Sequence, residues 1–319
     1  MENKKVSVIV PVYNVENYIR ECVFSVTNQT LDEIEIICVN DAGTDNSWEI
    51  VREMATMDNR IVLLENAKNA GLAATRNKGL DIAKGEYVYF LDADDMITPN
   101  ALEMLYSRAV KEALEVQIFA ASFIYENAEL EEKFKNNPRV FKQEYPDVIS
   151  GRELFIKWME VWDWMPSQPR FFYNREFLNC NKIRYTEGML HEDEIFAFEV
   201  LEAAKRVRVT QDEFFIRRFR QASIMTGGPN IKNVEGCIKI LDRIKNSINA
   251  DGSEIEWNKA VDFYMYKIFK DATRKYRLAY TDKKLDKPMI SALSDEIKND
   301  AVKMNIFHMI ESFGLWEEI

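Results

Sequence analysis

The sequence predicts an α/β protein with a mostly parallel sheet flanked by helices, followed by a C-terminal helical region. Short apolar runs alternate with amphipathic stretches over the first hundred residues, and the chain changes character after Gly227-Gly228-Pro229. Strands that alternate with helices form largely parallel, helix-covered sheets. With 319 residues, 47% hydrophobic and 30% charged, the chain is long enough for one such domain and an extension.

Four apolar runs in the first hundred residues have the length and composition of buried strands. They are expected at Val6–Val10, which Pro11 would end, and at Ile34–Val39, Ile61–Leu64 and Glu86–Leu91. Helices are expected to follow each run, with apolar positions at Val15, Ile19, Cys22 and Val26, then at Trp48, Val51 and Ala55, and then over Ala73–Ala83. An N-cap at Thr98 and an N1 proline at Pro99 predict one more.

Beyond about Val116 the alternation loosens, which is typical of a sheet that gains antiparallel strands. Ser150 is expected to cap a helix that runs through Trp162 and that Pro166 ends. Asn127–Asn137 is either an exposed loop or a frayed helix. After Asn230, apolar residues at helical spacing predict about three helices.

The charge balance and the cysteine content argue against several classes of protein. There are 42 Lys and Arg residues against 53 Asp and Glu, a net charge of −11. With no long basic run, the chain is unsuited to nucleic acid but suited to a divalent cation. Its four cysteines are scattered, which argues against a disulfide framework or a zinc site. No signal peptide or long apolar segment is visible, so we expect a cytoplasmic protein.

Polar residues follow three of the four predicted strands. They are Pro11-Val12-Tyr13-Asn14, Asn40-Asp41 and Asp92-Ala93-Asp94-Asp95. In open parallel sheets, ligands bind beyond the carboxyl ends of the strands. Asp92 and Asp94 would repel each other there, and a divalent cation that also binds a diphosphate relieves that repulsion. The alternative is that both are ordinary loop or capping residues.

Six short motifs occur in order between residue 4 and about residue 226. They are Pro11–Asn14, Asn40–Asp45, Asn69-Ala70-Gly71 with Arg76-Asn77, Asp92–Asp94, His191–Glu194 with Phe196, and Arg218–Ile224. Together they resemble the family 2 glycosyltransferases, which have the GT-A fold. Asn40-Asp41-Ala42-Gly43 departs from the commoner Asp-Asp-Gly-Ser, which leaves the nucleotide base preference open.

The resemblance implies a domain organisation. Residues 1–226 would form the catalytic domain, in which 1–105 bind the nucleotide sugar and 106–226 bind the acceptor. Residues 227–319 would be a C-terminal helical region.

The resemblance also implies a donor site and a cation site. The nucleotide-sugar contacts would be Pro11, Tyr13, Asn14, Asp41, Asn69, Gly71, Arg76, Asp92, Ala93, Asp94, Arg218, Arg220 and Ser223. Asp94 and Asp92 would hold Mn²⁺ or Mg²⁺. Tyr13 and Asp41 suit a uridine-type nucleotide, since they supply a stacking surface and a carboxylate.

Arginines would meet the donor phosphates from two directions. Arg76 would reach them from a helix, and Arg218 and Arg220 would close over them with Ser223. Each of these side chains also has an ordinary structural reading. Tyr13 would be a core aromatic, Arg76 a surface ion pair, and Arg218 and Arg220 part of a solvated strand face.

The acidic motif supplies the expected catalytic base, which deprotonates the acceptor hydroxyl in an inverting single displacement. We favour Asp193 over Glu192 by motif placement. An acidic helix start is the structural alternative, since carboxylates stabilise the helix dipole there. A carboxylate at a helix start would still be well oriented to act as a base.

The acceptor is expected to be a carbohydrate or a lipid-linked glycan. Trp158, Trp162 and Trp164 could stack on sugars, although i,i+4 spacing favours core packing. Basic and aromatic residues between Tyr266 and Tyr280 indicate either peripheral membrane contact through the C-terminal helices or a solvated face.

Other functions are weighed against the glycosyltransferase. A sugar nucleotidyltransferase normally begins with a glycine-rich loop, which is absent from 11–17. A non-catalytic nucleotide-sugar-binding or scaffold protein remains the other alternative. The sequence gives no indication of oligomeric state.

Overall fold

The computed structural model describes residues 4–145, 147–221, 231–248 and 254–281. An eight-stranded sheet has the order β3-β2-β1-β4-β7-β6-β8-β5. The pairs β1–β2, β2–β3, β1–β4 and β6–β8 are parallel, and β4–β7, β6–β7 and β5–β8 are antiparallel. The predicted parallel arrangement is therefore confirmed for the N-terminal half, and the sheet becomes mixed beyond β4.

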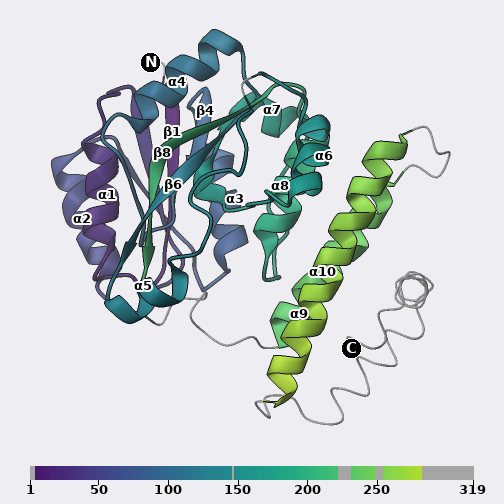
Figure 1. The fold of residues 1–319 in the computed structure, drawn as a ribbon. Helices are drawn as coiled ribbons and strands as arrows, with labels where there is room; N and C mark the ends of the chain where they lie inside the picture. Colours follow the sequence, from purple (N-terminus) through teal and green to yellow (C-terminus); the bar gives the residue numbers. More distant parts are fainter. Residues whose placement is uncertain (1–3, 146, 222–230, 249–253, 282–319) are drawn as a thin grey trace. The chain divides into compact units, whose positions relative to one another are not determined.

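The N-terminal half alternates strand and helix as predicted. Its elements are β1 (Val6–Val12), α1 (Ile19–Thr27), β2 (Ile34–Asn40), α2 (Ser47–Met57), β3 (Ile61–Glu65), α3 (Leu72–Ile82), β4 (Tyr87–Phe90), β5 (Met96–Ile97) and α4 (Ala101–Glu112). Figure 1 shows α1 and α2 on one side of the sheet and α3 and α8 (Glu192–Ala203) on the other. Alternate residues of β1 face these two layers, because successive side chains of a strand point to opposite faces.

Three predicted boundaries are wrong for identifiable reasons. Strand β1 continues through Pro11, because β4 pairs with β1 only as far as Ile9 and the missing N–H is not needed beyond that point. Helix α1 begins at Ile19, because residues 16–18 form a turn in which the backbone oxygen of Val15 accepts from Tyr18 N at 2.9 Å. Helix α4 begins at Ala101, because β5 precedes it and pairs with β8.

The second half adds strands and helices around the extended sheet. Its elements are β6 (Val116–Tyr125), α5 (Ala128–Phe134), α6 (Gly151–Val161), a 3₁₀ turn η1 (Gln168–Arg170), β7 (Phe171–Asn174), α7 (Arg175–Cys180), α8 and β8 (Val207–Phe219). Ser150 Oγ accepts a hydrogen bond from Glu153 N at 3.2 Å, which confirms the predicted cap. Asn127 caps α5 through Leu130 N, so that segment is a helix.

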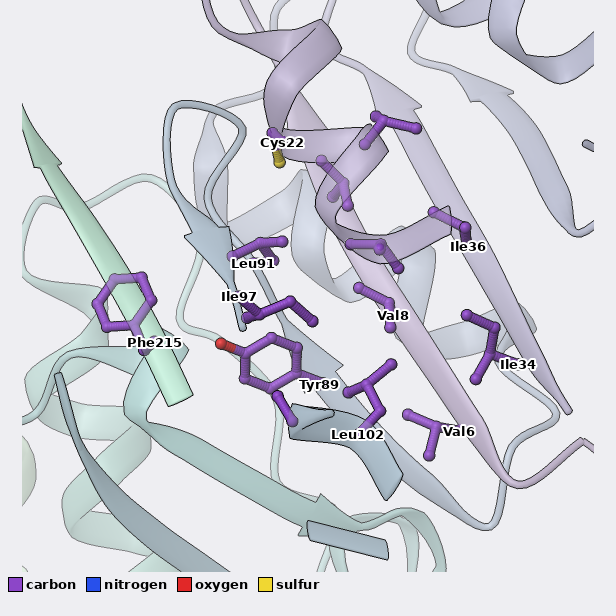
Figure 2. Close-up of a cluster of buried hydrophobic side chains, with 14 of the residues drawn as sticks. Val6, Val8, Cys22, Ile34, Ile36, Tyr89, Leu91, Ile97, Leu102 and Phe215 are labelled. Atoms are coloured by element: carbon purple, nitrogen blue, oxygen red, sulfur yellow. The ribbon is translucent and has the colours of Figure 1, made fainter. Parts of the chain in front are cut away.

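Buried apolar side chains from β1, β2, β4 and α1 form the main core. Figure 2 shows Val8, Cys22, Ile36 and Tyr89 in this cluster. On the opposite face, α3 lies so close to β1 that a Cβ atom on Gly79 would be 2.5 Å from Ile9 Cγ2. This close approach fixes α3 against the sheet, and α3 carries Arg76.

The chain divides into two compact units. The first contains Met1–Gly188 and Glu192–Ser223, and the second contains Met189–His191 and Ile224–Ile319. The second unit includes α9 (Ile231–Ile244), a 3₁₀ turn η2 (Lys245–Ser247) and α10 (Ile255–Thr281). Two of the three predicted C-terminal helices are thus present; the third, and the predicted boundary at 226/227, lie outside the described residues.

In the second unit, polar contacts join the helices to the short segment Met189–His191. Lys275 Nζ lies 2.8 Å from His191 Nε2, and Asn233 Nδ2 lies 3.4 Å from the same atom. No described helix is both long and apolar enough to cross a membrane. Peripheral membrane contact stays a prediction, and part of the segment on which it rests, including the side chains of Tyr276 and Tyr280, is not described.

Candidate active site

The candidate site lies beyond the carboxyl ends of β1, β2 and β4, where α3, the start of α8 and the end of β8 add side chains. Parallel pairing places these three strand ends at one edge of the sheet. The start of α8 reaches the same place through Arg76, whose side chain is fully buried. The end of β8 reaches it through Arg218, whose backbone N–H donates to Asp95 Oδ1 at 2.7 Å.

Arg76 binds three carboxylates from two other elements. Its Nη1 lies 2.7 Å from Asp193 Oδ1 and 3.2 Å from Glu192 Oε1, and its Nη2 lies 2.7 Å from Asp92 Oδ1. One positive charge therefore faces three acidic groups. The alternative reading of Arg76 as a surface ion pair is wrong, because the guanidinium is enclosed by protein.

Asp193 combines access to solvent with an unusual proton affinity. Its side chain is 31% exposed. Removal from water raises its pKa to about 7; Glu192 and Asp92 also raise it, while Arg76 opposes the shift. Burial likewise raises the pKa of Glu192, which is only 7% exposed. A carboxyl group with a pKa near neutrality that remains accessible has the properties of a general base.

The backbone of Asp193 is also fixed by a hydrogen bond. Gln168 Nε2 donates to the backbone oxygen of Asp193 at 3.3 Å. The hydroxyls of Tyr173 and Tyr185 both donate to Gln168 Oε1, at 2.6 and 3.1 Å. Asp193 lies in the first turn of α8, so the acidic helix start that was the structural alternative is present.

The arginines at the end of β8 gather around the second acidic strand end. Arg220 Nε donates to Asp94 Oδ2 at 2.6 Å, and Arg218 Nε donates to the backbone oxygen of Asp94 at 3.1 Å. Both guanidinium groups lie over the Tyr18 ring; the distance to its centroid is 5.3 Å for Arg218 and 5.1 Å for Arg220. Their side chains are each 17% exposed, so they are not part of a solvated strand face. Ser223, from the same motif, lies outside the described residues.

Asp41 organises the predicted nucleotide side of the site. Its Oδ1 accepts from Ala70 N and Asn66 Nδ2, both at 2.8 Å, and its Oδ2 accepts from Gly71 N at 3.0 Å. Gly71 has a φ of +87°, which disfavours other residue types. Asp41 therefore fixes the turn before α3, and whether it also touches a nucleotide stays a prediction.

The other predicted nucleotide contacts lie in or after β1, after β4 and before α3. Tyr13 is 47% exposed, which rules out a core role. Asn14 has a φ of +50°, and its Oδ1 accepts from Thr44 N at 2.8 Å. Asn69 is exposed and Ala93 is buried, whereas Pro11 is a buried residue of β1. An exposed aromatic ring beside an ordered polar turn suits a nucleoside.

Asp92 and Asp94 are the residues predicted to bind a metal ion. Among the described residues, no group of three or more His, Cys, Asp or Glu side chains is arranged to hold one. Asp92 and Asp94 each use one carboxylate oxygen in an ion pair, with Arg76 and Arg220. Mg²⁺ is usually bound by one or two carboxylates together with substrate phosphates and water. Two acidic side chains therefore fit a cation whose remaining ligands come from a diphosphate.

Several neighbours of the site were not predicted. Asn77 receives the backbone N–H of Tyr185 on Oδ1 and donates to its carbonyl oxygen, both at 2.9 Å. Tyr18 donates to Glu126 at 2.8 Å. Asn77 stands in a quoted motif, but its partner lies 108 positions away, and no sequence pattern indicates that distance.

The fold and the site define an α/β protein with an acidic site at the carboxyl ends of parallel strands. The chain belongs to glycosyl transferase family 2, which it matches over residues 7–180. It is 34% identical to EpsH of Bacillus subtilis (strain 168) over 70% of this chain. The match spans 64% of the length of EpsH.

Two solved structures share the architecture. TarS 1–349 of S. aureus, in complex with UDP-GlcNAc, has a TM-score of 0.65 at 24% identity, covering 82% of this chain and 71% of that chain. The mannosyltransferase PcManGT from Pyrobaculum calidifontis, in complex with GDP-Man and Mn²⁺, has a TM-score of 0.57 at 17% identity and covers 92% and 79%. These likenesses confirm the expected GT-A fold.

Proposed function

We propose that the protein is an inverting glycosyltransferase, which moves a sugar from a nucleoside diphosphate donor to an acceptor hydroxyl. The observation that carries the proposal is the position of Asp193. Its side chain is partly exposed and has a pKa of about 7. It forms an ion pair with Arg76, which also pairs with Asp92, a residue of the proposed donor site. Membership of glycosyl transferase family 2 supports the reaction class.

Asp193 is the base in this proposal. It takes the proton of the acceptor hydroxyl while that oxygen forms a bond to the anomeric carbon of the donor sugar. The bond from that carbon to the phosphate oxygen breaks, and its electron pair leaves with the nucleoside diphosphate. Attack opposite the leaving group inverts the anomeric configuration. Holding both reactants at one sheet edge lowers the entropic part of the barrier.

The leaving diphosphate needs positive charge around it. Arg218 and Arg220, together with Ser223, are proposed to donate hydrogen bonds to it. Asp94 and Asp92 would hold Mn²⁺ or Mg²⁺, which stabilises negative charge on the departing phosphate when it is bound. The GDP-Man and Mn²⁺ complex of PcManGT is consistent with a divalent cation at such a site.

The nucleotide is proposed to be a uridine diphosphate. Tyr13 offers an exposed ring for stacking, and the Asp41 turn lies after the neighbouring strand. TarS, with the same fold, was solved with UDP-GlcNAc. We propose a carbohydrate or lipid-linked glycan as acceptor, in polysaccharide or glycoconjugate synthesis at the inner face of the cell membrane.

A donor screen tests the proposal. UDP- and GDP-sugars would be incubated with the full chain, with and without Mn²⁺ or Mg²⁺, and nucleoside diphosphate release would be measured. We expect cation-dependent binding and slow donor hydrolysis, which a suitable acceptor accelerates. Absence of binding to every nucleotide sugar would contradict the proposal and favour a scaffold. Formation of a nucleotide sugar from a nucleoside triphosphate and a sugar phosphate would favour a nucleotidyltransferase.

A further inference from the structure

We propose that Arg76 is a positioning residue, which fixes the base-bearing start of α8 against the donor-side residue Asp92 and does not touch the donor phosphates. This inference rests on the proposed function and deepens it. It replaces the expectation that Arg76 reaches the diphosphate from α3. The argument rests on the burial of Arg76, on its partners, and on the rigidity of the helix that carries it.

Burial separates Arg76 from any ligand. Its side chain is 0% exposed, whereas those of Asp92 and Asp193 are 33% and 31% exposed. The carboxylates thus lie between the guanidinium and solvent. Both terminal nitrogens already donate to carboxylates, and the Tyr185 ring centroid lies 5.1 Å from the guanidinium carbon. Arg76 Nε has no hydrogen-bond partner, but it is buried as well, so no donor of this guanidinium is open to a phosphate group in the structure.

The planar fork of arginine matches what this position requires. Nη1 binds Asp193, which is 117 positions away in the sequence, and Nη2 binds Asp92, which is 16 positions away. A single rigid group therefore joins the loop after β4 to the first turn of α8. The ammonium of a lysine is a point charge and lacks this fixed geometry. Three carboxylates gathered here without a buried cation would repel one another and separate.

The helix that carries Arg76 is itself fixed. Gly79 places α3 against Ile9 of β1, with no room for a side chain. The next residue, Asn77, binds both backbone polar groups of Tyr185. The Tyr185 ring stacks on Phe196 of α8, with centroids 4.0 Å apart. Two adjacent residues of α3 therefore hold α8, Arg76 by its ion pairs with Glu192 and Asp193 and Asn77 through the Tyr185 backbone.

A double-mutant cycle separates positioning from phosphate binding. The variants are Arg76→Lys, Asp193→Asn and the combination, in the full chain. Arg76→Lys alone should lower acceptor transfer by about 100-fold, as expected for a base displaced by about 1 Å. In the Asp193→Asn background the same change should cost less than about threefold, because residues that act as a unit are non-additive. UDP affinity should change by less than about threefold in every variant.

Two controls keep the result interpretable. Arg52→Lys alters an exposed arginine paired with Glu65, and it should leave transfer unchanged. Asn77→Ala keeps all charges of the site but releases Tyr185, and it should lower transfer about tenfold with UDP affinity retained. This second variant carries the test if Arg76→Lys does not fold, as judged by thermal unfolding.

The outcomes that overturn the inference are distinct from failure of the proposed function. A fall in UDP affinity of about tenfold or more in Arg76→Lys would make Arg76 a phosphate ligand. Fully additive losses in the cycle, or an Asn77→Ala variant with full transfer, would also contradict positioning. Absence of sugar transfer by the unaltered protein would instead reject the glycosyltransferase proposal itself.

Discussion

The pH dependence of acceptor transfer should report the ionisation of Asp193. Burial, with Glu192 and Asp92 nearby, raises its pKa to about 7 despite the opposing charge of Arg76. The base must be deprotonated, so the rate is lost as pH falls through that value. Below it, kcat/KM for the acceptor should fall about tenfold per pH unit, to about 10% of its plateau at about pH 6. An ordinary aspartate, with a pKa of about 3.9, would keep the rate level over this range.

The assay measures kcat/KM because this quantity reports ionisations of the free enzyme. Nucleoside diphosphate release would be followed with limiting acceptor, from about pH 4.5 to 8.5 at constant ionic strength. Circular dichroism at each pH controls for unfolding, and donor affinity over the same range controls for titration of the donor site. An acid limb with its midpoint below about pH 5 would refute the assignment of the raised pKa to the catalytic base.

Three further predictions concern the proposed donor site and the packing of α3 against the sheet. Asp94→Ala should abolish cation-dependent donor binding with the fold intact; unchanged affinity in calorimetry with donor and Mn²⁺ would contradict the cation assignment. Asp41→Ala removes the acceptor of three hydrogen bonds and should weaken UDP and UDP-sugar alike, by about 1–3 kcal/mol. A loss confined to the sugar part, measured by calorimetry, would exclude a nucleotide role. Gly79→Val should lower the urea unfolding free energy by about 1–3 kcal/mol through overpacking against Ile9, and an unchanged midpoint would show that α3 can move.

Sequence alone predicts those residues of the site that directly follow a predicted strand. Tyr13, Asp41 and Asp92 each follow a strand, and parallel pairing brings the ends of strands to one edge. Short apolar runs predicted these strands, and the structure confirms them. The two-residue β5 was missed, because it carries too little periodicity to be recognised. Beyond Val116 the sequence predicted antiparallel additions without locating β6, β7 or β8.

The sequence did not predict how deeply each charged side chain is buried, or which charged residues distant in the sequence form ion pairs. Arg76 follows a glycine turn near the start of a helix, and that position suggested a phosphate contact. The structure buries it instead, because its partner Asp193 lies 117 positions later and closes over it. Arg220 likewise finds Asp94 across 126 positions. A motif gives residue types and their order, whereas tertiary packing decides which charge is enclosed and which is left for a ligand.

The most direct test of the central claim is the transfer rate of Asp193→Asn, measured beside donor affinity. Asparagine keeps the size of the side chain but cannot accept the proton, so transfer should fall by about 100- to 10,000-fold while donor affinity changes little. Glu192→Gln, which alters the more deeply buried neighbour, is the matched control and should be milder. An active Asp193→Asn variant beside an inactive Glu192→Gln variant would contradict the account and place the base on Glu192.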